Sequence, residues 1–291
     1  MAEQELFGFL NIYKPVGMTS HDVVGILRRV TKIRQIGHTG TLDPFAEGVL
    51  PVCIGKATRL IEYLEDDKAY VGTFCFGKST DSYDIEGNIV QEFNEKVSEE
   101  EVKEYLKNFE GEIEQTPPIY SAIKVGGKKL YEYAREGKEV EIKSRKVFIE
   151  KIELVSFNET EQTAEIYIKC SKGTYIRSIA HDLGEGLNNG CYLSRLKRVQ
   201  AGRFMIENAV QLNDLKTVED VSKNLIYPLE YLPQAKQELN EIEYNRAIHG
   251  MPVYNRIDAK KGEVILTKDG KLIAFTKVTS DGLKIAKVFV N

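Results

Sequence analysis

The sequence predicts an α+β fold, in which a largely antiparallel mixed sheet carries peripheral helices and a small β-rich domain follows it. Three observations lead to this prediction. Apolar and polar residues alternate over residues 164–170, as in a half-buried strand, whereas apolar residues recur at helical spacing over residues 102–109. Near the C-terminal end, the pairs Asp269-Gly270 and Asp281-Gly282 separate alternating segments, which is typical of hairpins. Strands that meander with helices inserted between them favour an α+β domain.

Length and composition limit the possible classes of protein. The chain has 291 residues, of which 42% are hydrophobic and 29% charged, which suits one large domain with a small companion and argues against wholesale disorder. No apolar run approaches membrane-spanning length and the acidic start does not resemble a signal peptide, so we expect a cytoplasmic protein. The four cysteines are far apart without a C-x-x-C pair, which argues against a zinc site or a disulfide framework.

In the N-terminal part, the pattern predicts strands that flank one helix and one loop. A strand is expected over residues 6–13, followed by a turn at Lys14-Pro15 and a helix that begins at Thr19 or Ser20. A glycine-rich loop at residues 37–48 comes next. Strands are then expected over residues 49–54 and 70–76.

The remaining elements follow from capping residues and periodicity. Ser98 and Glu101 form a capping box that opens a helix, whose apolar stripe reaches Gly111. A long strand is expected over residues 147–154, a second over 164–170, and a helix over 176–187. After Pro233, a polar helix over about residues 237–249 precedes the hairpins. We therefore place a large domain at residues 1–235 and a small β-rich one at residues 236–291.

Charge is unevenly distributed, although the net charge of the chain is only −4. Residues 91–115 contain three lysines and nine glutamates, a net charge of −6, whereas residues 120–151 and 171–203 each carry a net charge of +4. Two basic stretches could line one phosphate-binding surface while the acidic helix points elsewhere. A plain solvated surface is the alternative explanation of such charge runs.

The densest cluster of unusual residues is the loop at residues 37–48, which reads GHTGTLDPFAEG. Its glycines permit close approach of the backbone, and Asp43 stands between Leu42 and Pro44, which makes its carboxylate a candidate for chemistry. The alternative is structural, with Asp43 capping a turn and His38 acting as a hydrogen-bonded loop histidine. Neither of the two common phosphate-binding glycine motifs is present in this loop.

Two further candidates lie elsewhere in the chain. In CSKGTYIR, at residues 170–177, a helix start would aim backbone N–H groups and Lys172 at an anion, while Arg177 would keep a nearby carboxylate ionised or form a structural surface pair. Tyr70 is either a core residue or an aromatic platform for a base. The four histidines lack metal-ligand spacing and no G-x-S-x-G motif occurs, so neither a metal site nor a serine hydrolase is expected.

Several long motifs occur in a fixed order along the chain. They are GFLNIYKPVGMTSHDVV, GHTGTLDPFAEGVLPVCIGKATRL, DKAYVGTFCFG, TPPIYSAIKVGGKKLYEYAREG, and CSKGTYIRSIAHDLG followed by YLSRLKRVQAG. In order and spacing they resemble the motifs of the bacterial tRNA pseudouridine-55 synthases. The resemblance covers nearly all of residues 8–205, and the small C-terminal domain is similar to that family's RNA-binding domain in placement and hairpin pattern.

This resemblance implies that a uridine in the T-loop of tRNA, at position 55, is isomerised to pseudouridine, with Asp43 as the catalytic carboxylate and Arg177 as its partner. The N-glycosidic bond breaks and the base rejoins through C5, so substrate and product are isomers and neither a cofactor nor a metal is expected. Asp43 would attack C1′ of the sugar, attack C6 of the base, or abstract a ribose proton, and the sequence does not choose among these routes. Tyr70 resembles the residue that stacks on the flipped base.

The same resemblance implies further binding positions. His38 is expected to fill the space that the base leaves, Tyr175 and Leu196 to line the uracil pocket, and Lys14 with Pro15 to support its floor. The basic segment at about residues 120–146 resembles a thumb insertion that closes over the tRNA loop. The expected partner is therefore the T-arm of tRNA, with no membrane and no metal, and the expected state is a monomer.

Two alternatives stay open at this point. A guide-RNA-dependent relative of the archaeal and eukaryotic type lacks the thumb insertion, so its presence here favours the stand-alone form. A tRNA-binding folding chaperone, with secondary or absent catalysis, would not need Asp43, Tyr70 and Arg177 together.

Overall fold

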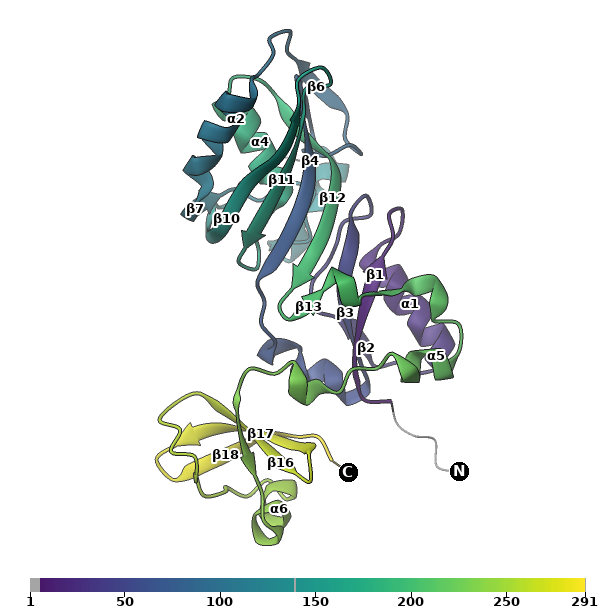
Figure 1. The fold of residues 1–291 in the computed structure, drawn as a ribbon, viewed down its shortest axis with the longest axis vertical. Coiled ribbons are helices and arrows are strands. Elements are labelled where there is room, and N and C mark those ends of the chain that lie inside the picture. Colours follow the sequence, from purple (N-terminus) through teal and green to yellow (C-terminus); the bar gives the residue numbers. More distant parts are fainter. Residues whose placement is uncertain (1–5, 139, 291) are drawn as a thin grey trace.

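The computed structural model describes residues 6–138 and 140–290, so residues 1–5 and 291 of the expected domains and residue 139 of the expected thumb lie outside the description. The molecule is elongated, with the large sheet and the C-terminal sheet at opposite ends (Figure 1). Within the described residues, the large sheet has ten strands and the C-terminal sheet has four. The predicted α+β class, with a separate β-rich C-terminal part, is confirmed.

The large sheet is mixed but mostly antiparallel. Its strands are β1 (Gly8–Lys14), β2 (Ile36–His38), β3 (Glu47–Ile54), β4 (Lys68–Phe76), β7 (Gly111–Gln115), β10 (Arg145–Asn158), β11 (Thr163–Cys170), β12 (Cys191–Ala201), β13 (Phe204–Met205) and β14 (Val210–Gln211). The main order is β14-β1-β3-β12-β4-β11-β10-β7, and only the pairs β1–β14 and β12–β3 are parallel among those described. Because β12 pairs with both β3 and β4, it joins the two halves of the sheet.

Most of the described helices pack an apolar stripe against one of the two sheets. The described helices are α1 (Ser20–Thr31), α2 (Glu99–Leu106), α3 (Leu130–Arg135), α4 (Ile176–Gly186), α5 (Val218–Lys223) and α6 (Glu241–Ile248), with 3₁₀ segments η1 (Gly55–Tyr63), η2 (Lys107–Phe109), η3 (Ile206–Asn208), η4 (Leu212–Asp214) and η5 (Pro228–Glu230). Capping boxes at Thr19 and Ser98 start α1 and α2. Helices α2 and α4 lie on one face of β4, β10 and β11 (Figure 1). No described helix is long and apolar enough to cross a membrane.

The C-terminal sheet is not an isolated unit. It consists of β15 (Ala235–Glu238), β16 (Glu263–Lys268), β17 (Lys271–Thr279) and β18 (Gly282–Val288), in that order. One of its faces packs on α6, and the other contributes to an apolar core shared with β1, β3 and η1. In this shared core, the ring of Tyr63 stacks on Phe275 with 4.1 Å between centroids. The two sheets are thus joined by side-chain packing as well as by the chain.

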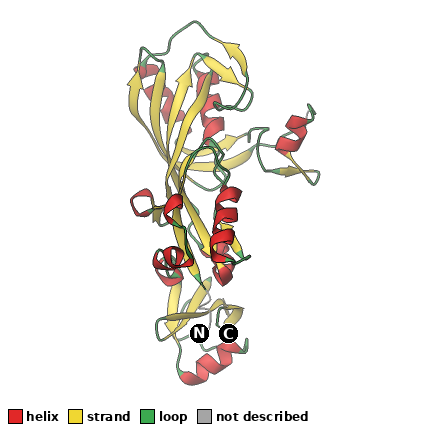
Figure 2. Cartoon of the chain, turned by 90° about the vertical axis from the view of Figure 1, so that its right-hand side faces the viewer, coloured by secondary structure: helices red, strands yellow, loops and turns green. Residues whose placement is uncertain are grey.

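Two small hairpins extend from the large sheet. One is formed by β5 (Lys78–Thr80) and β6 (Ile89–Glu92), and the other by β8 (Lys124–Val125) and β9 (Lys128–Lys129), which leads directly into α3. Figure 2 shows a short helix and hairpin, those of residues 124–135, standing away to one side of the sheet. This projection coincides with the segment expected to be a thumb.

Strand β12 and the segment at residues 235–249 show why some of the sequence-based expectations differ from the structure. Strand β12 was not predicted, because two register irregularities and the buried Arg198 interrupt its alternation of apolar and polar residues. The polar helix expected over about residues 237–249 is wrong at its start, since residues 235–238 pair in parallel with β16. Helix α6 begins only at Glu241, where Asn240 and Glu243 form a capping box.

Candidate active site

A cleft of about 400 Å³ opens at the junction of the two halves of the large sheet. Five residues expected from the sequence line it, namely Asp43, Tyr70, Tyr175, Arg177 and Leu196. They come from the loop between β2 and β3, from β4 and β12, and from the start of α4. Tyr131 of the projecting segment and Tyr120, which precedes it in the chain, form another wall. Segments far apart in the sequence therefore meet at one site.

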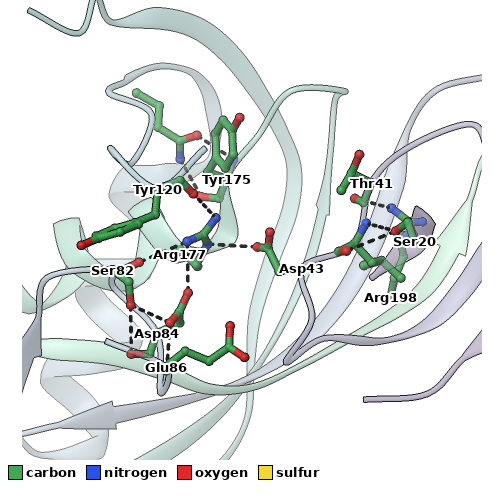
Figure 3. Close-up of polar contacts among 12 residues, drawn as sticks. Ser20, Thr41, Asp43, Ser82, Asp84, Glu86, Tyr120, Tyr175, Arg177 and Arg198 are labelled. Carbon is green, nitrogen blue, oxygen red and sulfur yellow. Dashed lines mark hydrogen bonds and ion pairs between the residues drawn. The ribbon is translucent and has the colours of Figure 1, made fainter. Parts of the chain in front are cut away.

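Arg177 is the centre of a polar network in this cleft (Figure 3). Its Nε lies 3.0 Å from Oδ2 of Asp43, and its Nη1 lies 3.0 Å from Oδ2 of Asp84. Its Nη2 donates to the carbonyl of Tyr120 at 2.9 Å. The side chain of Arg177 is only 5% exposed, whereas that of Asp43 is 35% exposed. The guanidinium is thus fixed from several sides and presents one edge to a carboxylate that remains open to the cleft.

The electrostatics of Asp43 result from opposing effects. Desolvation raises the pKa of its carboxyl, and the charge of Asp84 acts in the same direction. The guanidinium of Arg177 and the ammonium of Lys14 oppose this rise, yet the net direction of the pKa is upward. Arg177 therefore offsets the effect of burial on the pKa of Asp43 without overcoming it, which modifies the expectation that this arginine keeps the nearby carboxylate ionised.

The backbone on both sides of Asp43 is anchored by buried polar side chains. The hydroxyl of Ser20 accepts from the N–H of Leu42 at 2.8 Å and donates to its carbonyl at 3.1 Å. Lys14, which is completely buried, approaches the carbonyl of Pro44 at 3.5 Å and has its pKa lowered to about 8 by desolvation. The loop is thereby held at the residues that immediately precede and follow the carboxylate.

Arg198 of β12 provides a third anchor. It is fully buried, and its Nε donates to the carbonyl of Val49 at 2.7 Å. Its two Nη atoms reach the carbonyls of Gly40 and Thr41, at 3.0 and 3.4 Å (Figure 3). Its charge also acts on Tyr70, where it opposes the rise in pKa that burial causes. One buried cation thus lies between the loop that carries Asp43 and the aromatic wall of the cleft.

The aromatic wall is held in place by neighbouring groups. Tyr70 is buried in β4, and burial raises the pKa of its hydroxyl. The backbone of Tyr175 is held on both sides by Gln115, whose Oε1 accepts from its N–H at 2.7 Å and whose Nε2 donates to its carbonyl at 3.0 Å. The guanidinium carbon of Arg145 lies 4.8 Å from the centre of the Tyr175 ring. These contacts limit the freedom of both rings before any ligand binds.

The other expected residues lie outside the lining of the cleft. His38 is in β2, partly buried beside His21, and burial lowers its pKa to about 4. Pro15 is partly buried and its carbonyl accepts from Lys14 at 2.9 Å, in the turn next to the loop that carries Asp43. Lys172 is exposed and pairs with Asp66 at 2.6 Å. The anion-binding role expected of Lys172 stays a prediction, which this ion pair does not favour.

Sequence reasoning missed Ser20, Asp84 and Arg198, although all three shape the site. Asp84 lies in a loop rich in turn-forming residues, where an acid is ordinary, and nothing local indicates that it meets Arg177. Arg198 was counted only as part of a basic stretch. Among residues 6–138 and 140–290, no group of three or more His, Cys, Asp and Glu is arranged to hold a metal ion.

Solved structures share this architecture. The chain superposes on the structure described as "Crystal Structure of a Cbf5-Nop10-Gar1 Complex" with a TM-score of 0.73 and 26% identity, covering 98% of this chain and 85% of that one. A second, "Structure of H/ACA RNP bound to a substrate RNA containing 2'-deoxyuridine", has the same TM-score at 24% identity and covers 98% and 86%. These likenesses establish the fold, whereas the class of protein follows from the sequence.

Comparisons of sequence specify the family. Residues 28–176 match the TruB family pseudouridylate synthase (N terminal domain), and residues 177–233 match the tRNA pseudouridylate synthase B C-terminal domain. The tRNA pseudouridine synthase B of Clostridium novyi (strain NT) is 40% identical, covering 97% of this chain and 99% of that protein. The tRNA pseudouridine synthase B of Symbiobacterium thermophilum is 49% identical, covering 74% of this chain and 73% of that protein. The chain belongs to the TruB family and is a tRNA pseudouridine synthase, an isomerase.

Proposed function

We propose that this enzyme isomerises uridine 55 in the T-loop of tRNA, with Asp43 as the reacting carboxylate. The observation that carries the proposal is the placement of Asp43, open to a cleft of about 400 Å³ and 3.0 Å from a buried arginine. A cleft of this volume suits one small ligand such as a nucleoside. Tyr70 and Leu196 supply apolar walls for a base, beside the only acidic residue that lines this cleft among the described residues.

The reaction needs a group that can act at the sugar or the base. The N-glycosidic bond breaks, the uracil turns within the site, a bond forms between C1′ and C5, and the proton on C5 moves to N1, so atoms and electrons balance without a co-reactant. The Asp43 carboxylate can start this sequence by attack at C1′, by attack at C6, or by abstraction of a ribose proton. In each route, Arg177 orients the carboxylate and favours its charged form.

Access to the uridine requires that it leave the stack of the loop. Extrusion costs a few kcal/mol, and stacking on an aromatic side chain returns about 1 to 3 kcal/mol per base. The Tyr70 ring, which is buried in β4 and lines the cleft, is in position to stack on the flipped base. Tyr175 and Leu196 would enclose the uracil. His38, neutral near pH 7 because burial lowers its pKa, would occupy the space that the base leaves.

The projecting segment and the partner also belong to the proposal. Residues 120–146, with their basic excess, would close over the T-arm as a thumb, and Tyr120 and Tyr131 already face the cleft. The names of the bacterial relatives, which cover almost the whole chain, support a stand-alone tRNA enzyme over a guided one. A monomer without a metal and a cytoplasmic location stay predictions.

The test is a pseudouridine map of an unmodified tRNA transcript after incubation with the purified protein alone. We expect modification at uridine 55, none in a transcript with cytidine there, and no turnover by Asp43→Asn, which should still bind tRNA because the phosphate contacts are untouched. A requirement for a second RNA would support the guide-dependent alternative. Appreciable turnover by Asp43→Asn would remove Asp43 from the chemistry, and binding without any modification by the wild-type enzyme would favour a chaperone.

A further inference from the structure

The cleft contains more positive charge than the chemistry of Asp43 uses. Among the described residues, three cations line it, namely Lys68, Arg145 and Arg177. Arg177 forms ion pairs with Asp43 and Asp84 and donates to the carbonyl of Tyr120, so its charge is already compensated within the protein. Uracil and ribose are uncharged, so neither of the other two cations is needed to neutralise the reacting nucleoside.

Arg145 is already engaged on the protein side. It donates to the carbonyl of Gly173 and lies over the ring of Tyr175, 4.8 Å from its centre. The arrangement suits a residue that fixes one wall of the cleft. Arg145 keeps unused donors, among them a buried Nε, but its guanidinium is fixed on the Tyr175 wall, whereas Lys68 shares strand β4 with Tyr70.

The side chain of Lys68 lies against the loop that carries Asp43, and its ammonium group still has hydrogen-bond donors available. Its Nζ donates to the carbonyl of Asp66 at 2.9 Å, and an ammonium has three donors, so two remain for a ligand. A Cβ built on Gly40 would lie 3.2 Å from Cε of Lys68, which shows how closely the side chain follows the loop that carries Asp43. Desolvation and the charge of Arg198 lower the pKa of Lys68, and the nearby acids Asp66 and Asp67 offset this only in part.

The position of Lys68 relative to Tyr70 points to its ligand. The two residues are the first and third of β4, so their side chains leave the same face of the strand. A nucleotide whose base stacks on Tyr70 has its sugar and phosphate beyond the edge of the ring. Phosphate is the one charged group that an RNA substrate brings, and lysine binds it as a compact point charge.

We infer that Lys68 is a substrate-binding residue that holds a phosphate next to the flipped uridine, an inference that rests on the proposed flipping of the base onto Tyr70. Lys172, to which the sequence pattern assigned an anion, is instead paired with Asp66 outside the cleft. By holding the backbone on one side of the target nucleotide, Lys68 fixes the distance between C1′ and the Asp43 carboxylate.

The test compares Lys68→Met with Lys169→Met. Lys169 lies on the neighbouring strand β11, where it pairs with Glu150 at 2.7 Å and does not line the cleft. We expect Lys68→Met to lower kcat/KM for a T-arm RNA by about 10- to 100-fold, the range for a lost hydrogen bond to a charged group. The slope of the logarithm of the RNA-binding constant against the logarithm of salt concentration should become less steep by about 0.7, which corresponds to the loss of one single-strand phosphate contact. Lys169→Met should change neither quantity.

A second arm identifies the phosphate. T-arm RNAs with a neutral methylphosphonate immediately 5′ or 3′ of the target uridine are assayed with both enzymes. One of these substitutions should slow the wild-type enzyme as much as Lys68→Met does and have no further effect on that variant. Additive losses, or a wild-type enzyme that tolerates both substitutions, would overturn the inference. A wild-type enzyme that fails on the unsubstituted RNA would instead overturn the proposed function.

Discussion

At the scale of single residues, the site is a chain of three charged groups, of which Asp84 and Arg177 are buried and Asp43 is open to the cleft. Arg177 lies between Asp43 and Asp84, at 3.0 Å from each. The Asp84 carboxylate also accepts from the hydroxyl of Ser82 at 2.6 Å and from the N–H of Glu86 at 3.0 Å, so it is fixed independently of Asp43. One carboxylate therefore orients the guanidinium, and the guanidinium orients the other carboxylate, which we propose meets the substrate.

This arrangement determines the acid side of the pH profile. The proposed reaction requires ionised Asp43, so we expect activity to be lost as pH falls through the pKa of this carboxyl, which desolvation and Asp84 raise above its ordinary value. Asp84→Asn removes the like charge and leaves the cations Arg177, Lys14 and Arg198 to act on Asp43. We expect the acid limb of single-turnover rate against pH to move to lower pH in this variant, together with a lower maximal rate. A limb at unchanged or higher pH would contradict the assigned electrostatics.

Tyr70 provides a test of base flipping. Tyr70→Ala removes the ring that faces the cleft but leaves the basic surface intact. We expect the single-turnover rate to fall by about 5- to 150-fold, the equivalent of one lost stacking interaction. The Kd for tRNA should change much less, because most phosphate contacts survive. Equal losses of rate and affinity, measured by rapid quench and filter binding, would argue against a stacking platform.

At the scale of elements, the loop between β2 and β3 depends on its anchors. Ser20 makes two hydrogen bonds with Leu42, the neighbour of Asp43. We expect Ser20→Ala to lower kcat about tenfold or more, because a small shift of a reacting group is costly, while KM changes little. The free energy of unfolding should decrease by about 1–3 kcal/mol for the two lost bonds. Steady-state kinetics and urea denaturation measure the two effects.

The control lies at the other end of the same helix. Thr31 is buried, and its hydroxyl donates to the carbonyl of Leu27 at 2.7 Å and accepts from the N–H of Ile33 at 3.2 Å. Thr31→Val should therefore cost a similar free energy of unfolding without a loss of kcat. If both variants lose kcat in proportion to their stability, Ser20 has only a structural role.

The elements that the sequence predicted are those whose signals are local. Helix α2 was predicted from its capping box, which the structure contains as expected. Strand β12 was missed for two reasons. Its register with β4 is irregular, and Arg195, Lys197 and the buried Arg198 give it more charge than a central strand usually has. In the same way, Asp43 stood out in its loop, whereas Asp84 and Ser20 are defined by partners distant in the chain.

At the scale of the whole molecule, the two sheets share a hydrophobic core. Phe275 of β17 is fully buried between Tyr63 of η1 and Phe289, whose ring centres lie 4.1 and 6.0 Å from its own. Residues from β1 and β3 complete this core. Since β3 continues directly from the catalytic loop, the C-terminal sheet supports the strands that carry the site. We therefore expect the two parts to unfold together, in one cooperative transition.

Phe275→Ala tests this coupling. Removing the ring should lower the free energy of unfolding by about 3–5 kcal/mol, as for other buried aromatic residues, and should weaken amide protection in η1 as well as in β17. Ile273→Ala is the matched control, because Ile273 is buried on the opposite side of β17, in the core beneath α6. It should destabilise β17 and α6 by about 2–5 kcal/mol while η1 keeps its protection from native-state exchange.

Equal effects of both variants on η1 would mean that destabilisation of the C-terminal sheet, and not the shared core, controls the large sheet. No effect of Phe275→Ala on η1 would show that the two sheets are energetically independent.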